Sequence, residues 1–267
     1  MSANQPPPPP PGGYGAPPPA GGPGAQPPVP GGGQWDLGAT VSYGWNKFQQ
    51  NMAQIIIAAL AMVIGMIVIA VVGFVLVGLL SSDAEYVCEY DDLGFVEDCD
   101  WEGGTPFILS MILFLLVYFV MFLYAQIIGA GIIRGALGIT EGRPFQASEV
   151  FKFDKIGPVV VTSLIVGAAT FVGLLLCYLP GLVIMFATSY SLYFVIDKGM
   201  APMDAIKASV NLVKENLSST LIWYIVGGLI ASAGAIVCGI GMLVTIPIML
   251  IGTAYTYKTL TGQPVAP

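Results

Sequence analysis

Residues 197–217 read DKGMAPMDAIKASVNLVKENL, and this stretch lies between two apolar blocks that contain no charged residue. Its apolar side chains recur every three or four positions, which places them on one stripe of an α-helix: Met203, Ile206, Val210, Val213 and Leu217. Lys207 and Lys214 fall beside this stripe. The pattern predicts an amphipathic helix that lies in a membrane surface, with the stripe toward the lipid.

The composition places the rest of the chain in a membrane as well. Only 9% of its 267 residues are charged and 55% are apolar, whereas a soluble domain carries about 25% charged residues. The chain has no histidine, which removes the commonest general base and the commonest metal ligand. The usual hydrolase triads are therefore excluded, and we expect neither an enzyme nor a metal or other cofactor site.

Charge-free segments divide the chain into six predicted membrane spans. A hydrocarbon core about 30 Å thick needs roughly 20 apolar residues in a helix. Two apolar blocks of 40 residues are long enough for two spans each, with turn signals at residues 178–181 and 238–241. The predicted spans cover about residues 54–80, 106–133, 157–178, 181–196, 218–238 and 240–257.

The charged residues predict the orientation of these spans. With the N-terminus inside, all nine lysines and arginines lie on the inner face, as the positive-inside rule requires: Lys47, Arg134, Arg143, Lys152, Lys155, Lys198, Lys207, Lys214 and Lys258. The loop at residues 81–105 has nine acidic residues and no basic one, and it falls outside. We therefore expect a multi-pass protein of the plasma membrane (the bacterial inner membrane), with both termini cytoplasmic.

The spans group into three helical hairpins, each preceded by an interfacial amphipathic helix. These helices are expected at residues 36–52, 144–156 and 202–217; Asp36 can cap the first, and the second has the weakest stripe. A glycine shortly before a proline recurs where each unit ends, at residues 141–144, 198–202 and 261–264. Glycine can end a helix and proline can open the next one. We expect an all-α integral membrane domain at residues 34–262, arranged either as a threefold repeat or with helix stops that coincide by chance.

A tail rich in proline and glycine precedes this domain. Thirteen of residues 1–33 are proline and nine are glycine, and such a segment has too little apolar surface to fold. We expect it to be disordered and to lack a cleavable signal peptide. Two readings stay open: a solubilising tail, or a docking strip for a protein partner that recognises proline.

Two pairs of cysteines are candidates for disulfide bonds. Cys88 and Cys99 lie in the predicted outer loop, where the environment is oxidising and favours a bridge. The alternative is weak binding of a divalent cation by the acidic residues around them. Cys177 and Cys238 end the third and fifth predicted spans on the outer side, so a second bridge is possible, although cysteine in an apolar helix also serves as a small hydrophobe.

The second half of the chain resembles a known family. The residues that carry the resemblance are YSLYFVIDKG at 190–199, AIKASVNLVKEN at 205–216, GIGMLVTIP at 239–247 and AYTY at 254–257. They are similar to six-helix bacterial membrane proteins that include the membrane domain of some glycerophosphodiester phosphodiesterases, over about residues 36–262. The tail resembles that of proline/glycine-rich transmembrane proteins of mycobacteria. The resemblance implies an architecture and an envelope setting, and it brings no catalytic residues.

Two functions fit these features. The first is a non-enzymatic membrane protein of the cell envelope that organises or assists partner proteins or lipids. The second is a transporter, channel or lipid-handling protein for an apolar or zwitterionic cargo, since the predicted spans hold no charged residue for ion coupling. Nucleic acid is not an expected partner, because the few basic residues lie at the membrane surface.

Small residues at Gly227, Ala231 and Ala235 fit either a packing seam inside the bundle or a homodimer face.

The predicted orientation can be tested with an amine reagent that does not cross membranes. The variant Asp91→Lys should react in intact cells, because the outer loop then carries its first lysine. The unaltered protein should react only after permeabilisation, since Lys207 and every other lysine are predicted inside. Labelling of Lys207 in intact cells, read by mass spectrometry, would contradict this orientation.

Overall fold

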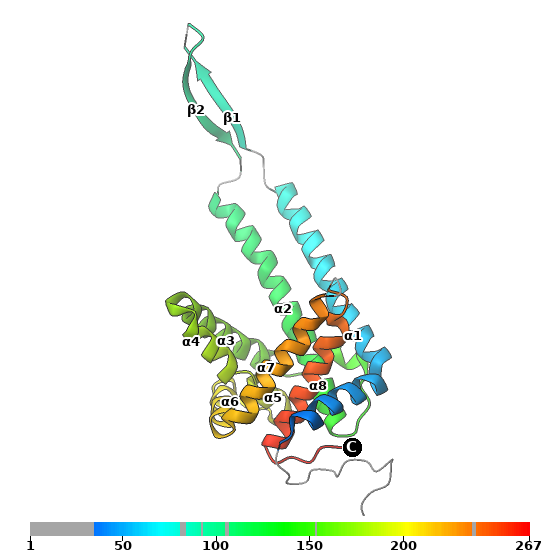
Figure 1. Cartoon of the computed structure of the whole chain (residues 1–267). Coiled ribbons are helices and arrows are strands. Elements are labelled where there is room, and N and C mark those ends of the chain that lie inside the picture. The colour runs from blue at the N-terminus through cyan, green and yellow to red at the C-terminus, as the bar shows by residue number, and fades with distance from the viewer. Residues whose placement is uncertain (1–34, 81–83, 92, 105–106, 153, 237–238) are drawn as a thin grey trace, which may run out of the picture.

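The computed structural model describes residues 35–80, 84–91, 93–104, 107–152, 154–236 and 239–267, so the predicted tail at residues 1–33 lies outside the described residues. Figure 1 shows α1 and α2 as a long pair that rises from the helical body and carries two strands at its far end. In chain order the elements are α1 (Leu37–Leu80), β1 (Ala84–Tyr90), β2 (Val96–Gly103), α2 (Phe107–Thr140), the 3₁₀ helix η1 (Ala147–Phe151), α3 (Ile156–Cys177), α4 (Leu179–Ala187), α5 (Ser191–Lys198), α6 (Pro202–Glu215), α7 (Leu217–Ala233), the 3₁₀ helix η2 (Gly234–Ile236) and α8 (Met242–Leu260).

Among the described residues, five helical segments are long and apolar enough to cross a membrane: Leu37–Leu80, Ile108–Thr140, Ile156–Cys177, Leu179–Lys198 and Leu217–Ile236. Their large apolar side chains are exposed over continuous surfaces, and such exposure to water is unfavourable. Ile64, for example, is 57% exposed and Leu115 is 59% exposed. The sixth predicted span corresponds to α8, a helix of 19 residues whose second half is buried. The helical, multi-span character is thus confirmed, whereas the count of six spans stays a prediction.

The first predicted interfacial helix and the first predicted span are one helix, α1, so the expectation of two helices is corrected. Figure 1 shows that α1 changes direction between its blue and cyan parts without a break. A buried face runs along both parts and includes Thr40, Gly44, Phe48, Ile55 and Ala58. No glycine or proline stands between residues 45 and 64 to end the helix. The predicted cap is confirmed, because Asp36 Oδ1 accepts a hydrogen bond from the Ala39 amide at 2.7 Å.

The second predicted interfacial helix is also corrected, because among the described residues of 144–156 the short 3₁₀ helix η1 is the only helix before α3 begins at Ile156. Side chains from α1 hold this segment against the bundle. Asn51 Oδ1 accepts a hydrogen bond from the Phe145 amide at 2.8 Å, and Gln54 Oε1 accepts one from the Ala147 amide at 3.2 Å. These side chains satisfy backbone donors outside a helix, so the segment is stable without forming an α-helix.

Two glycines of α2 allow the segment that contains η1 to pack close to the helix backbone. A Cβ atom at Gly131 would lie 2.4 Å from Val150 Cα, and one at Gly135 would lie 2.1 Å from the ring of Phe145. Val150 is fully buried and Phe145 is 4% exposed. Small residues therefore let the segment that contains η1 pack directly on the helix backbone.

The fourth predicted span is divided into α4 and α5. The break before α4 falls at Tyr178, and Pro180 lies in the first turn of α4, where proline is tolerated. A second break follows at residues 188–190. Ser209 of α6 bridges it, because its hydroxyl accepts a hydrogen bond from the Tyr190 amide at 3.1 Å and donates one to the Ala187 carbonyl at 2.8 Å.

The expectation of an all-α fold is corrected by a two-stranded antiparallel sheet in the predicted outer loop. Strands β1 and β2 pair with Cys88 opposite Cys99. The sulfur atoms of these cysteines lie 2.06 Å apart, the distance of a disulfide bond, as the sequence predicts. No strand was predicted in this loop, because acidic residues are depleted in strands. The many acidic residues of the loop also interrupt any alternation of apolar and polar residues that would indicate a strand.

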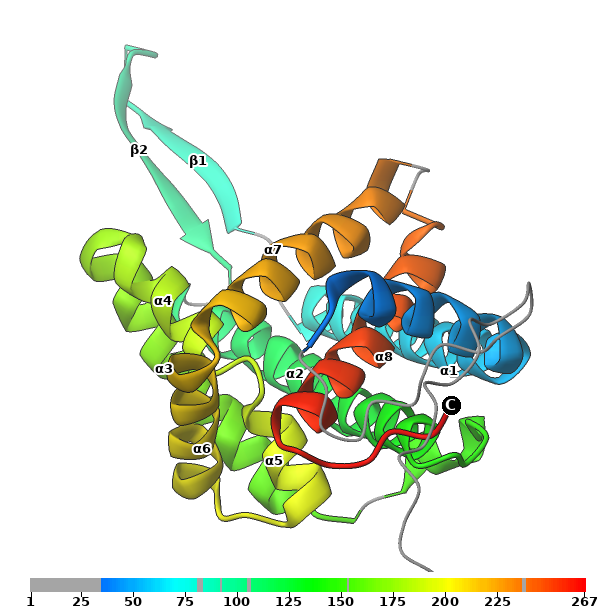
Figure 2. The same cartoon turned by 60° about the horizontal axis from the view of Figure 1, so that its bottom comes forward.

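Helix α8 lies at the centre of the body, in contact with α1, α2 and α7; Figure 2 shows it crossing between α1 and α7. A Cβ atom at Gly252 would lie 2.4 Å from the ring of Trp223 in α7. The Trp223 Nε1 group donates a hydrogen bond to Thr253 Oγ1 at 3.0 Å. Gly227 is buried in α7 and faces Met249 of α8, so this position belongs to a packing seam inside the bundle.

The close packing of α2 predicts different effects for two neighbouring alanine substitutions. Gly131→Ala should lower the free energy of unfolding by about 1–3 kcal/mol, because the new methyl group displaces the backbone of Val150. Gly129→Ala is the matched control, since a Cβ atom there meets nothing within 4 Å; better helix propensity should make it neutral or stabilising by up to about 1 kcal/mol. Denaturant titration in mixed micelles measures both, and equal effects would contradict the packing argument.

Candidate functional site

The ammonium group of Lys258 lies at the centre of a buried polar cluster. Lys258 is in the last turn of α8 and is 3% exposed. Its Nζ atom donates hydrogen bonds to Asp197 Oδ1 at 2.7 Å, to Gln263 Oε1 at 2.8 Å and to Glu141 Oε1 at 3.1 Å. These three bonds use all the donors of an ammonium group.

The carboxylate of Asp197 is bound as completely as the ammonium group. Its Oδ2 atom accepts hydrogen bonds from the Tyr257 hydroxyl at 2.9 Å and from Gln263 Nε2 at 3.1 Å. Tyr257 is fully buried. The side chain of Asp197 therefore receives charge-assisted and neutral hydrogen bonds from α8 and from the segment that follows α8.

Arg143 completes the charge balance of the cluster. Its Nη2 atom lies 2.7 Å from Glu141 Oε2, so two cationic side chains face two carboxylates. Partial burial by itself would raise the pKa of Glu141, but hydrogen bonds from Arg143 and Lys258 outweigh burial and hold this pKa below its ordinary value. The ionised form of Glu141 is thus the form that the cluster stabilises.

Three helix ends bring these residues together. Helices α2, α5 and α8 each end close to a glycine in the left-handed region, with φ of 81° at Gly142, 63° at Gly199 and 68° at Gly262. Glycine adopts this conformation without strain and lets the chain leave the helix sharply. The same glycines are the repeated signals of the sequence, so the repeated motif positions the charged residues before it.

Aromatic rings cover one side of the cluster. The ring centroid of Tyr257 lies 5.0 Å from that of Phe194 and 5.8 Å from that of Tyr193. Tyr193 and Phe194 are 3% and 4% exposed. These rings shield the ion pair of Lys258 and Asp197, whose side chains are 4% and 11% exposed, and a site with little water strengthens this interaction.

The segment after α8 covers another side, as Figure 2 shows for the red end of the chain. Val265 is 6% exposed, and the Ala266 amide donates a hydrogen bond to the Thr140 carbonyl at 2.8 Å. The cluster therefore joins α2, α5, α8 and this segment into one base. Every donor of Lys258 is occupied, so its hydrogen bonds hold these segments together.

The predicted surface helix is present as α6, with its faces divided differently from the expectation. Its buried face consists of Ala205, Ser209, Leu212 and Val213, which pack toward α3 and α5. The predicted stripe lies beside that face: Val213 is buried, Ile206 and Val210 are half-buried, and Met203 is 51% exposed. Leu217 is 55% exposed but belongs to α7. Lys207 and Lys214 are exposed, whereas Met203 is the one stripe residue of α6 that is exposed.

The predicted cysteine sites have separate outcomes. Cys88 and Cys99 are brought together, as described above, whereas Cys177 is exposed at the end of α3 and Cys238 lies outside the described residues. The bridge between Cys177 and Cys238 therefore stays a prediction. Among the side chains that the structure describes, no group of three or more cysteines and carboxylates gathers as a metal site would need.

The local sequence patterns did not predict that Glu141, Asp197 and Lys258 form a cluster. Lys258 was counted among the basic residues that set the topology, Glu141 stood in a repeated glycine signal, and Asp197 opened the stretch before the predicted surface helix. One signal was available: each charged residue stands one to four positions before the repeated glycine. The sequence does not show which of these charged residues pair, however, because Glu141 and Lys258 are 117 positions apart in the chain.

The apolar helices define the class of this chain, a multi-pass helical membrane protein. No protein-family model matches it, and no solved structure does. It is 32% identical over 231 residues to the uncharacterised protein Rv2560 of Mycobacterium tuberculosis, over 86% of this chain and 70% of that one. The uncharacterised protein Mb2590 of Mycobacterium bovis matches with the same identity and coverage. The chain belongs to this mycobacterial protein family.

Removal of the central cation predicts a large loss of stability. Lys258→Met leaves the carboxylates of Asp197 and Glu141 without their shared partner, so the free energy of unfolding should fall by about 3–5 kcal/mol. Lys207→Met is the matched control, because Lys207 is exposed on α6, and its effect should stay within about 0.5 kcal/mol.

A second substitution tests the cause of that loss. Adding Asp197→Leu to Lys258→Met removes one unpaired charge and should restore part of the stability. Denaturant titration in mixed micelles compares all three variants. Equal effects of Lys258→Met and Lys207→Met would show that the cluster does not stabilise the base.

Proposed function

We propose that this chain is a non-enzymatic protein of the plasma membrane that organises or assists partner proteins of the cell envelope. The observation that carries the proposal is the hairpin of β1 and β2, which stands beyond the helical body at the end of α1 and α2 (Figure 1). A disulfide between Cys88 and Cys99 joins its strands. A folded element held away from the rest of the molecule presents a surface to other molecules.

The closed polar cluster supports the same proposal. Lys258 and Asp197 use their polar atoms within the chain, which suits a rigid base and offers no reactive group to a substrate. The proposal places both termini in the cytoplasm and the hairpin outside, in agreement with the distribution of basic residues. The proline-rich segment at residues 1–33 then offers a second contact on the inner side.

The resemblance to the membrane domain of some glycerophosphodiester phosphodiesterases is part of this proposal as architecture alone. The repeated glycines Gly142, Gly199 and Gly262, each with a positive φ at a helix end, support an arrangement of three units. Six spans follow if α8 crosses the membrane with the five apolar segments. The match to mycobacterial proteins fits a cell-envelope setting and carries no activity to this chain.

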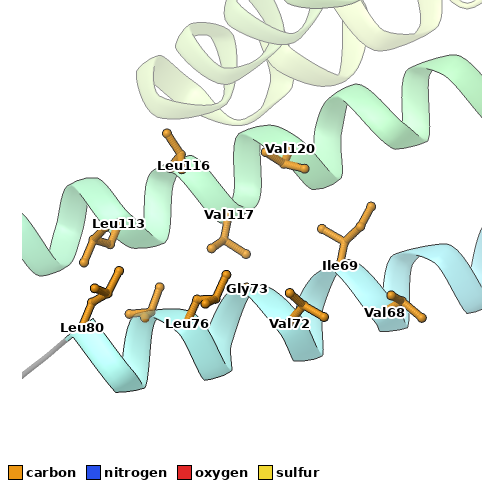
Figure 3. Close-up of a pocket in the computed structure, with 11 residues that line it drawn as sticks. Val68, Ile69, Val72, Gly73, Leu76, Leu80, Leu113, Leu116, Val117 and Val120 are labelled. Atoms are coloured by element: carbon orange, nitrogen blue, oxygen red, sulfur yellow. The ribbon is translucent and has the colours of Figure 1, made fainter.

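Lipid handling is the second candidate, and one observation favours it. A cavity of about 390 Å³ lies between α1 and α2 and is lined only by valine, leucine, isoleucine and glycine. Figure 3 shows Val117 of α2 pointing toward α1 beside Gly73, and Ile69 of α1 pointing toward α2. An acyl chain fits such a lining, because the cavity offers no polar partner to a charged or hydrogen-bonding ligand.

One purification tests both candidates. The full chain, extracted in mild detergent, should retain a defined set of envelope proteins, and a variant without residues 84–103 or without residues 1–33 should lose part of that set. Quantitative mass spectrometry measures the retained proteins. If the full chain retains no protein, the organising function is wrong.

The same preparation reports on lipid. Val72→Phe fills the cavity, whereas Val71→Phe is the matched control, because Val71 is equally exposed on α1 and does not line the cavity. Native mass spectrometry should show one bound lipid fewer only in Val72→Phe if the chain handles lipid. Equal lipid content in both variants would leave the organising function as the sole candidate.

A further inference from the structure

The tip of the β-hairpin exposes apolar side chains in an unusual concentration. Leu93 is 82% exposed, Phe95 is 70% exposed and Val96 is 57% exposed. The three lie within four positions of each other at the turn between β1 and β2. Single exposed apolar residues are common, but a contiguous apolar tip marks a contact surface.

The turn itself is rigidly built, so the exposure is a property of the fold. The Asp91 Oδ1 atom accepts hydrogen bonds from the amides of Leu93 at 2.9 Å and Phe95 at 2.8 Å. The Gly94 amide donates to the Asp91 carbonyl at 2.9 Å, and Gly94 has a φ of 84°. Asp91 thereby uses its carboxylate to hold the turn and fixes the apolar side chains that follow it.

The tip stands too far from the helices to be covered by the membrane that they cross. Strand β1 has seven residues, and at about 3.3 Å a residue the tip lies on the order of 20 Å beyond the ends of α1 and α2. Figure 1 shows the hairpin continuing away from the helical body, with no other element beside it. Leu93 and Phe95 therefore need a partner outside that membrane.

Charge decides which partner fits. Glu89 and Asp98 are both exposed and stand directly opposite each other across the strands, an arrangement that costs stability unless a cationic group lies between them. Residues 81–105 hold nine acidic residues and no basic one. A second copy of the hairpin would repel the first, and anionic lipid would repel it in the same way, whereas a basic surface would attract it.

We infer that the hairpin tip binds an extracytoplasmic protein whose apolar pocket receives Leu93 and Phe95 and is rimmed by lysine or arginine. The pocket buries the two side chains, and the basic rim faces Glu89 and Asp98. This inference rests on the proposed organising function and names the chemistry of its outer partner.

Photocrosslinking in cells that produce the full chain tests the inference. Benzoylphenylalanine in place of Leu93 should give one discrete protein adduct, and mass spectrometry should place the crosslink in a segment rich in lysine or arginine. The yield should fall about tenfold when Phe95→Ser is added, because a central apolar anchor is lost. It should fall several-fold with Glu89→Gln and Asp98→Asn together.

The control position is Leu79, which is 78% exposed near the end of α1; benzoylphenylalanine there should give adducts that do not respond to the charges at Glu89 and Asp98. A shift in gel mobility on reduction verifies that each variant keeps the bridge between Cys88 and Cys99. An adduct with a second copy, a lipid adduct alone, a crosslinked segment without basic residues, or no adduct overturns the inference. If the full chain still retains partners in detergent, such a result leaves the organising function in place.

Discussion

The hydrogen bonds of one buried lysine, Lys258, hold the base of this protein together. Lys258 brings a positive charge into a place that is almost closed to water, where an unpaired charge would cost several kcal/mol. Asp197 and Glu141 offset that cost, and Gln263 and Tyr257 bind the remaining polar atoms. These partners come from α5, α8, the end of α2 and the segment after α8. In this arrangement the buried charge of Lys258 is fully paired.

The base of the molecule differs in composition and packing from the long pair of α1 and α2 and from the β-hairpin that this pair carries. At the base, polar groups and aromatic rings are packed tightly among helix ends, and α2 approaches its neighbours through glycines. Along α1 and α2 the surface is apolar and exposed, which suits the hydrocarbon core of a membrane. Beyond them the chain changes to an acidic sheet with a disulfide, which suits an aqueous and oxidising side. The described parts of the chain thus differ in composition, and the apolar part along α1 and α2 is the one that suits a membrane.

Local signals predicted parts of this fold where one interaction dominates. The apolar runs indicated the long helices, Asp36 indicated the start of α1, and the spacing of Met203, Ile206 and Val210 indicated the helix α6. The same signals failed where neighbours compete with local preference. Asn51 and Gln54 bind backbone amides in the segment around η1, so a predicted surface helix does not form there. Ser209 binds the backbone on both sides of the break between α4 and α5, inside an apolar segment that is still long enough to cross a membrane.

The sequence by itself determined that the chain is a helical membrane protein, where most of its apolar helices run and that Cys88 pairs with Cys99. These features follow from composition and from spacing over a few residues, since burial in lipid acts on each segment separately. Only the tertiary structure decided that Glu141, Asp197 and Lys258 meet and that Leu93 and Phe95 stand exposed. A buried ion pair depends on distances between atoms that are far apart in the chain, and the exposure of a side chain depends on what does not pack against it. Neither quantity can be read from the order of residues.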